Sequence, residues 1–78
     1  MTLKIISAED ILFEGDVKVV HLPGSMGAFT VLPHHASLIS TLVAGKIGYE
    51  LPDGENTGVD ISGGIVDIDR DVVSVCVY

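Results

Sequence analysis

Three groups of side chains in this sequence have the chemistry needed for catalysis or metal binding. The first is a set of histidines, the second a set of aspartates and the third a single thiol. The histidines are His21, His34 and His35, the aspartates are Asp60, Asp67, Asp69 and Asp71, and the thiol is that of Cys76. Imidazole, carboxylate and thiolate groups ligate transition metals and calcium, and they also serve as acids, bases and nucleophiles. Whether they act together depends on their spacing.

The histidines lack the spacing of a metal site. His34 and His35 are adjacent, and in an extended segment adjacent side chains point to opposite faces, so the two cannot readily ligate one ion. A cupin-type site needs His-x-His followed by Glu, and that pattern does not occur. We therefore expect a surface histidine beside a packed one.

The aspartates alternate as they do at the start of a calcium-binding loop. Asp67, Asp69 and Asp71 fit the first positions of such a loop. However, Val72 stands where the loop needs glycine and Tyr78 where it needs glutamate. A solvated strand face followed by a turn explains this pattern better.

The thiol and the glycine-rich loop do not indicate a catalytic site either. Cys76 lies in a valine-rich segment with no basic neighbour in sequence that would favour its thiolate, so we interpret it as a small buried or half-buried hydrophobic side chain. The stretch Pro23–Gly27 lacks the G-x-G-x-x-G spacing and the Gly-Lys-Ser/Thr ending of a phosphate-binding loop. The sequence thus predicts no catalytic residue, no metal and no cofactor.

Length and composition indicate one small all-β domain over residues 1–78, since typical domain sizes leave no room for a second. Eleven valines and eight isoleucines favour strands, and nine glycines and three prolines supply turns. A net charge of -7 argues against nucleic acid and anionic lipid, and it fits a basic partner better. No segment has the apolar length of a transmembrane helix, and the first residues lack the order of a signal peptide, so we expect no membrane insertion.

Alternating polar and apolar residues, separated by turn residues, divide the chain into short strands. The predicted strands are Thr2–Ile5, Ile11–Asp16, Asp16–Val19, Ala28–Leu32, Leu38–Val43, Lys46–Leu51, Gly58–Ile61, Ile65–Ile68 and Val72–Val77. Leu38, Ser40 and Leu42 are expected to share one face. Two hairpins are expected, turning at Pro52–Asn56 and at Asp69–Asp71, a spacing typical of a sandwich or small barrel.

Several motifs, in this order and spacing, resemble the epsilon subunit of F-type ATP synthase. They cover nearly the whole chain and comprise Ser7-Ala8-Glu9, Phe13, Gly15, residues 19–38 with Pro23-Gly24 and Pro33-His34-His35-Ala36-Ser37-Leu38, Gly45-Lys46-Ile47, and residues 62–68 beginning Ser62-Gly63-Gly64. The chain departs from the family pattern at three positions. Ala28 replaces an acidic residue, His34 replaces a glycine and Ser37 replaces a proline.

The resemblance implies a flattened ten-stranded β-sandwich of short antiparallel strands. It also implies a non-catalytic, cofactor-free rotor subunit of the central stalk, at the cytoplasmic face of the bacterial inner membrane. Such a subunit binds the gamma subunit and the ring of c subunits, and thereby couples ion-driven rotation to ATP synthesis. By position, the gamma-facing residues are Ser7, His35 and Ser40, and the ring-facing loop is Ser25, Met26, Gly27 and Ala28.

Members of that family usually continue into two C-terminal helices that bind ATP in some cases and inhibit hydrolysis. This sequence ends at Tyr78, so we expect coupling without that form of inhibition.

A second hypothesis comes from the residues alone. The histidines and the acidic residues together motivate a small-ligand or metal-binding β-barrel as the alternative to a rotor subunit.

Overall fold

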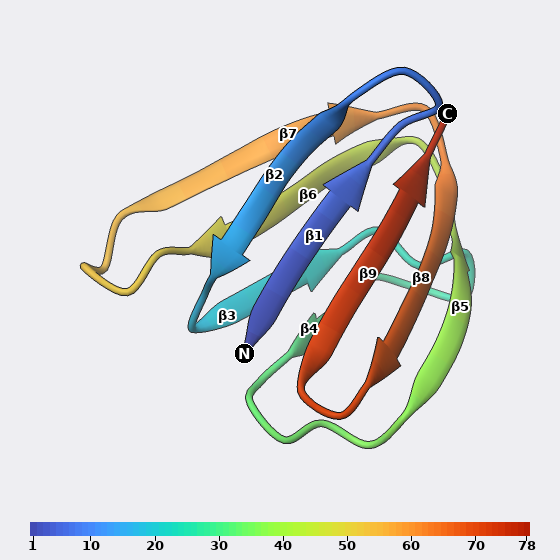
Figure 1. The fold of residues 1–78 in the computed structure, drawn as a ribbon. Helices are drawn as coiled ribbons and strands as arrows, with labels where there is room; N and C mark the ends of the chain where they lie inside the picture. The colour runs from blue at the N-terminus through green and yellow to red at the C-terminus, as the bar shows by residue number, and fades with distance from the viewer.

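The computed structural model describes residues Met1 to Tyr78, which form two β-sheets packed face to face (Figure 1). Its nine strands are β1 (Thr2–Ile6), β2 (Ile11–Asp16), β3 (Val19–Leu22), β4 (Phe29–Val31), β5 (Leu38–Leu42), β6 (Gly45–Glu50), β7 (Asn56–Ile61), β8 (Gly64–Asp69) and β9 (Val72–Val77). The molecule measures 28 × 24 × 18 Å and is therefore flattened. The all-β sandwich is confirmed, with nine strands where ten were predicted.

The five-stranded sheet has the order β2-β1-β9-β8-β5. Its strand β1 pairs antiparallel with β2 but parallel with β9, so that Leu3 lies opposite Val73. This pair departs from the predicted antiparallel arrangement. Parallel neighbours need a long connection between them, and here β2 to β8 all lie on that connection.

The four-stranded sheet has the order β4-β3-β6-β7. The predicted hairpins are both present. In the first, β6 and β7 pair from Gly45–Ile61 to Glu50–Asn56. In the second, β8 and β9 turn through Arg70 and Asp71, whose φ angles are 50° and 64°. Two central residues with positive φ make this a type I′ turn, which matches the twist of the strands it joins.

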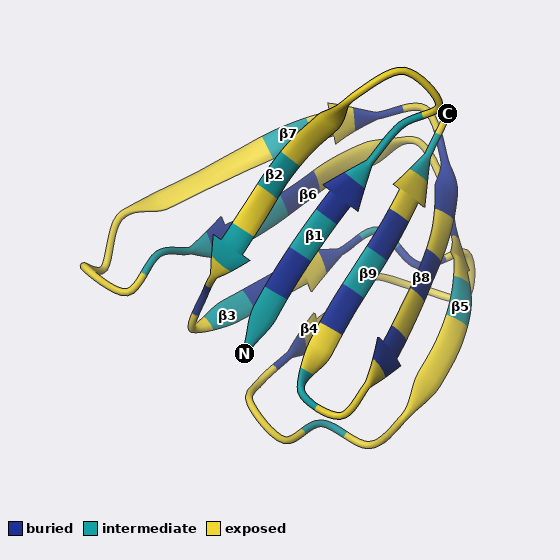
Figure 2. Ribbon diagram, in the orientation of Figure 1, coloured by how far each residue is buried: buried dark blue, intermediate teal, exposed yellow.

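The hydrophobic core lies between the two sheets and is built by alternate residues of each strand (Figure 2). Leu3 and Ile5 of β1 are fully buried, and Phe13 and Tyr49 pack with their ring centroids 4.4 Å apart. The buried hydrophobic residues are Leu3, Ile5, Val17, Val20, Leu22, Val31, Leu42, Ile47, Tyr49, Ile61, Val66, Ile68, Val73 and Val75. The outward residues of the same strands are left for solvent or a partner.

The predicted strand Asp16–Val19 is wrong, because the chain crosses from one sheet to the other at this point. Val17 turns into the core, and its N–H donates to the carbonyl oxygen of Met1 at 2.9 Å. The segment that comes nearest to a tenth strand is Gly24, which forms only an isolated bridge with Leu42 before the chain turns away.

Candidate functional site

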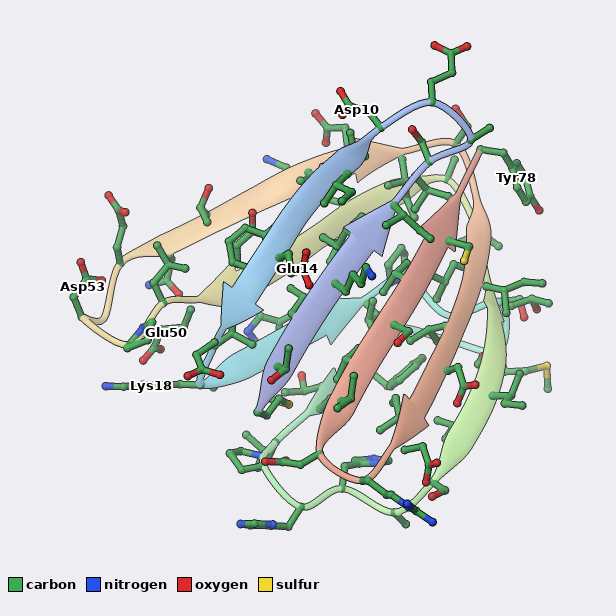
Figure 3. The ribbon with its side chains drawn as sticks, in the orientation of Figure 1. Asp10, Glu14, Lys18, Glu50, Asp53 and Tyr78 are labelled. Carbon is green, nitrogen blue, oxygen red and sulfur yellow. The ribbon has the colours of Figure 1, made fainter.

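Charge is distributed very unevenly along the chain. No Asp, Glu, Lys or Arg occurs from Leu22 to Gly45, and all eleven acidic and four basic residues lie outside this stretch. The stretch supplies the β3–β4 loop, β4 and β5, and each of these two strands is the outermost of its sheet. The charged side chains labelled in Figure 3 lie over β2 and at the β6–β7 end, away from β5: Asp10, Glu14, Lys18, Glu50 and Asp53. Asp67 and Asp69 lie on β8, the strand that pairs with β5.

The β3–β4 loop is tied to the end of β5. The N–H of Ser25 donates to the carbonyl oxygen of Thr41 at 3.0 Å, and the two hydroxyl oxygens lie 2.6 Å apart. We call residues 24–28 and 41–45 together the neutral tip, since none of them carries a charge. The neutral tip includes the whole predicted ring-facing loop.

Met26 is held out into solvent by a tight turn. The N–H of Gly27 donates to the carbonyl oxygen of Gly24 at 3.0 Å, which closes a β-turn with Ser25 and Met26 at its centre. Gly27 has a φ of 126°, which residues with a side chain rarely adopt. Gly24 is buried against Phe29, where a Cβ would lie 2.8 Å from the ring. Met26 is consequently 97% exposed on a well-fixed base.

Ser7 closes the turn between β1 and β2. Its Oγ accepts hydrogen bonds from the N–H groups of Asp10 at 3.2 Å and Glu9 at 3.4 Å. Its own N–H donates to the carbonyl oxygen of Asp10 at 2.8 Å. Beside this turn lies an open hollow of about 430 Å³, lined by Lys4, Ile6, Ser7, Glu9, Asp10 and Ile11.

His35 is half-buried in the β4–β5 loop, which two aspartates of the β8–β9 turn hold in place. Asp71 Oδ1 accepts from the N–H of His34 at 2.9 Å, and Asp69 Oδ1 accepts from Ser37 Oγ at 2.9 Å. Two of the aspartates that alternate like calcium ligands therefore anchor a loop.

The carboxylate of Asp71 also faces the Met1 ammonium group, 3.6 Å from its Oδ2. The hydrogen bond from the His34 N–H, and then the positive charge of Met1, lower the pKa of Asp71. A lowered folded-state pKa means that this contact stabilises the fold above the unfolded-state pKa of a carboxyl group. The stabilisation is lost as pH falls through the lower, folded-state pKa.

The backbone of His34 differs from the extended form that we assumed for the adjacent histidines. Its φ of 65° lies in the left-handed region, because the loop must turn there between the two sheets. A side chain in that region costs about 1–2 kcal/mol. The bond to Asp71 holds His34 in this conformation.

The structure does not gather Ser7, His35 and Ser40 into one cluster. Ser7 follows β1, which ends beside the end of the parallel strand β9. The loop of His35 is bonded to the turn from which β9 starts, so these two residues lie at opposite ends of the sheet. Ser40 is half-buried in the middle of β5, where it pairs with Val66. As predicted, it shares the inward face with Leu38 and Leu42.

The remaining histidine and the acidic residues are spread over the surface. His21 Nδ1 lies 2.9 Å from Thr30 Oγ1 across the β3–β4 pair. Asp60 and Asp67 are both exposed, but they lie on different sheets. No group of three or more His, Cys, Asp or Glu residues is placed to hold a metal ion. The structure also contains no helix long and apolar enough to span a bilayer.

Cys76 is exposed, so its interpretation as a buried or half-buried side chain is wrong. Val73 and Val75 of β9 point into the core, and the two-residue period of a strand then turns Cys76 outward. There it pairs with Ile65 on β8 and with Ile6 on β1.

The uncharged stretch is the feature that reasoning from the sequence missed. Its signal was present, because Leu22 to Gly45 can be read as free of charge directly from the sequence. The net charge of the whole chain concealed it. Counting charge segment by segment would have separated an acidic part of the chain from a neutral one.

Known proteins match this chain over its whole length. The family described as "ATP synthase, Delta/Epsilon chain, beta-sandwich domain" matches residues 1–78. The ATP synthase epsilon chain of Nitratiruptor sp. is 43% identical over 77 residues, 99% of this chain and 60% of the relative. That of Campylobacter fetus is 47% identical over 75 residues, 96% of this chain and 58% of the relative. The chain thus spans less than two thirds of the length of these relatives.

Two solved assemblies contain chains with the same fold. One is the Euglena gracilis mitochondrial ATP synthase, OSCP/F1/c-ring in rotational state 1, with a TM-score of 0.90 and 21% identity over 96% of this chain and 48% of that chain. The other is the central stalk/c-ring of the Tetrahymena thermophila mitochondrial ATP synthase, with a TM-score of 0.81 and 10% identity over 99% of this chain and 62% of that chain.

Proposed function

We propose, because the chain belongs to the ATP synthase delta/epsilon β-sandwich family, that it serves as a non-catalytic part of the central-stalk rotor. In this role it binds the gamma subunit and the ring of c subunits, and so couples ion-driven rotation to ATP synthesis. It is a peripheral component, and we place it at the cytoplasmic face of the bacterial inner membrane.

The observation that carries this proposal is the uneven distribution of charge. Every proposed contact residue except Ser7 lies within the uncharged stretch from Leu22 to Gly45. Covering an ionised group at an interface removes its hydration, which is costly unless a partner charge compensates. Protein interfaces accordingly have few charged residues at their centres. An uncharged edge on an otherwise acidic molecule is suited to permanent contact with another subunit.

The positions of the proposed gamma-facing residues support a broad contact. Ser7 and His35 lie at opposite ends of the five-stranded sheet, and Ser40 lies between them on an outer strand. A small ligand could not touch all three. An elongated protein partner lying along the sheet and around its free β5 edge could, and it would also cover the outward side chain of Ile39, which is 72% accessible.

Mixing the chain with purified gamma subunit and analysing the mixture by size-exclusion chromatography tests the proposal. We expect a stable complex with the wild-type chain, and a weaker one with His35→Glu or Ser40→Glu because each places a charge in the contact. Asn56→Glu, at the start of β7, is the matched control and should bind as the wild type does. Thermal unfolding of each variant verifies that it is folded.

Two results would contradict the proposal. One is the absence of any complex between the wild-type chain and gamma. The other is equal binding by the wild type and both folded variants, together with unimpaired ATP synthesis in membranes that carry them.

A further inference from the structure

We propose that the neutral tip contacts the ring of c subunits through apolar side chains centred on Met26, and that this contact is insensitive to salt. The inference rests on the proposed function, since it concerns the loop that would face the ring. It gives the chemistry of that contact, and it differs from the charge-based pairing that an acidic chain would otherwise lead one to expect.

The first step is the absence of charge where contact would occur. The chain has a net charge of -7, yet the neutral tip holds none of its ionised side chains. Ala28 stands where the epsilon subunit family has an acidic residue, and no other residue of the loop supplies a carboxylate in its place. A surface of this kind offers no charge for a basic partner to pair with. It is matched by an uncharged partner surface, because neither side then leaves an ion buried without a counter-ion.

The second step is the shape and the fixation of the tip. Met26 is 97% exposed, and Val43, on the hydrogen-bonded neighbouring segment, is 48% exposed. The N–H of Val43 donates to the carbonyl oxygen of Pro23 at 2.9 Å, which ties the two segments together beyond the Ser25–Thr41 contacts. Since the backbone is already held, binding costs little loop ordering. The methionine side chain itself remains adaptable and can fill an irregular apolar surface.

Binding of the chain–gamma complex to purified c ring, measured at two salt concentrations, tests this inference. We expect the dissociation constant of the wild type to change less than about twofold between about 50 and about 300 mM KCl, over which exposed charge pairs are strongly screened. Met26→Ala should weaken binding about tenfold, as truncation of a central contact residue does. Met26→Lys should weaken it further.

Leu12→Ala is the matched control. Leu12 is 42% exposed on β2, and β2 and β5 are the two outermost strands of the five-stranded sheet. This variant should bind the ring as the wild type does. Both positions are exposed, so the variants should unfold at nearly the temperature of the wild type, and a folding defect can be recognised by its lower Tm.

Three other results would overturn the inference. Binding that falls several-fold with salt and is equal for wild type and Met26→Ala would show a charged contact elsewhere. Equal capture of the chain by liposomes without c ring, lost in Met26→Ala, would identify lipid as the occupant. A wild-type chain that binds gamma but not the ring would remove the inference alone, whereas failure to bind either would remove the proposed function as well.

Discussion

The two sides of this sandwich are built with opposite chemistry. On the neutral side, the β3–β4 loop and β5 are fixed by glycine conformations, hydroxyl contacts and close packing. On the charged side, β2 and the turns after β1 and β6 carry carboxylates, and Ser7 and Asp53 accept hydrogen bonds from turn N–H groups. Net charge therefore describes poorly a molecule in which one loop and one outer strand carry none of it, although Asp67 and Asp69 lie on β8 beside that strand. The uncharged loop and strand are the parts suited to be covered.

The largest expected loss of stability comes from replacing a glycine, and it should be greater on the neutral side than on the charged side. Gly24→Ala should lower the free energy of unfolding by about 2–3 kcal/mol, as overpacking does, because its Cβ would lie 2.7 Å from the Gly27 oxygen and 2.8 Å from the Phe29 ring. Gly54→Ala, in the β6–β7 turn, should cost about 1 kcal/mol, since its φ of 91° is strained for alanine but its Cβ would meet nothing. Urea unfolding measures both. Equal losses would show that the neutral loop is not the more tightly packed side.

Hydroxyl groups should differ less between the two sides. Ser7→Ala removes an acceptor from two turn N–H groups and should cost about 1 kcal/mol, as loss of a helix cap does. Ser25→Ala should cost about 0.5–1 kcal/mol, the net value of one hydrogen bond. A double-mutant cycle with Thr41→Val isolates the Ser25–Thr41 pair, whose oxygens lie 2.6 Å apart. Additive losses would mean that this pair does not fix the neutral tip.

Relief of backbone strain should stabilise the corner that connects β4 with β5. His34→Gly should raise the free energy of unfolding by about 0.5–1 kcal/mol, because glycine adopts the φ of 65° without steric cost but gains freedom in the unfolded chain. His35→Gly is the control, since His35 has no positive φ, and it should destabilise. Thermal unfolding distinguishes the two. A destabilised His34→Gly variant would mean that the imidazole itself contributes to the fold.

The ion pair on the charged side should contribute least. Lys18 Nζ lies 4.0 Å from Glu50 Oε2, and both side chains are substantially exposed. Lys18→Ala should change the free energy of unfolding by less than about 0.5 kcal/mol, and high salt should remove that difference. Urea unfolding in low and high salt measures it. A salt-independent loss above about 1 kcal/mol would mean that this side is held together by its charges.

The sequence predicted the strands well where alternation and turn residues agree. The hairpin at 51–55 turns through Pro52, Asp53 and Gly54, which are typical turn residues. The hairpin at 70–71 was found from the alternation of its strands, since Arg70 and Asp71 adopt positive φ without a glycine. The alternation of polar and apolar residues gave a wrong prediction at Val17, because the chain crosses between the two sheets there and forms no strand. The prediction at Cys76 was also wrong, because a valine-rich neighbourhood does not tell which face of the strand a residue occupies.

The candidate site was predictable only in part. Local patterns cannot give the pairing of β1 with β9, since Leu3 and Val73 are far apart in the sequence. The roles of Asp69 and Asp71 as anchors of the His34–Ser37 loop depend on contacts between distant segments. The exposure of Met26 depends on the turn at Gly24 and Gly27, whose residues are visible in the sequence although their packing is not.

The parallel pairing of β1 with β9 also sets the order in which the molecule can be made. A ribosome releases β1 first, but its inner neighbour in the sheet exists only after residues 72–77 have been synthesised. Until then the edge of β1 that faces away from β2 stays unpaired. Pairing over so long a sequence separation is slow. The five-stranded sheet of a growing chain is therefore completed only at the end of synthesis. Loss of β9 would leave β1 and β8 without the strand that joins them.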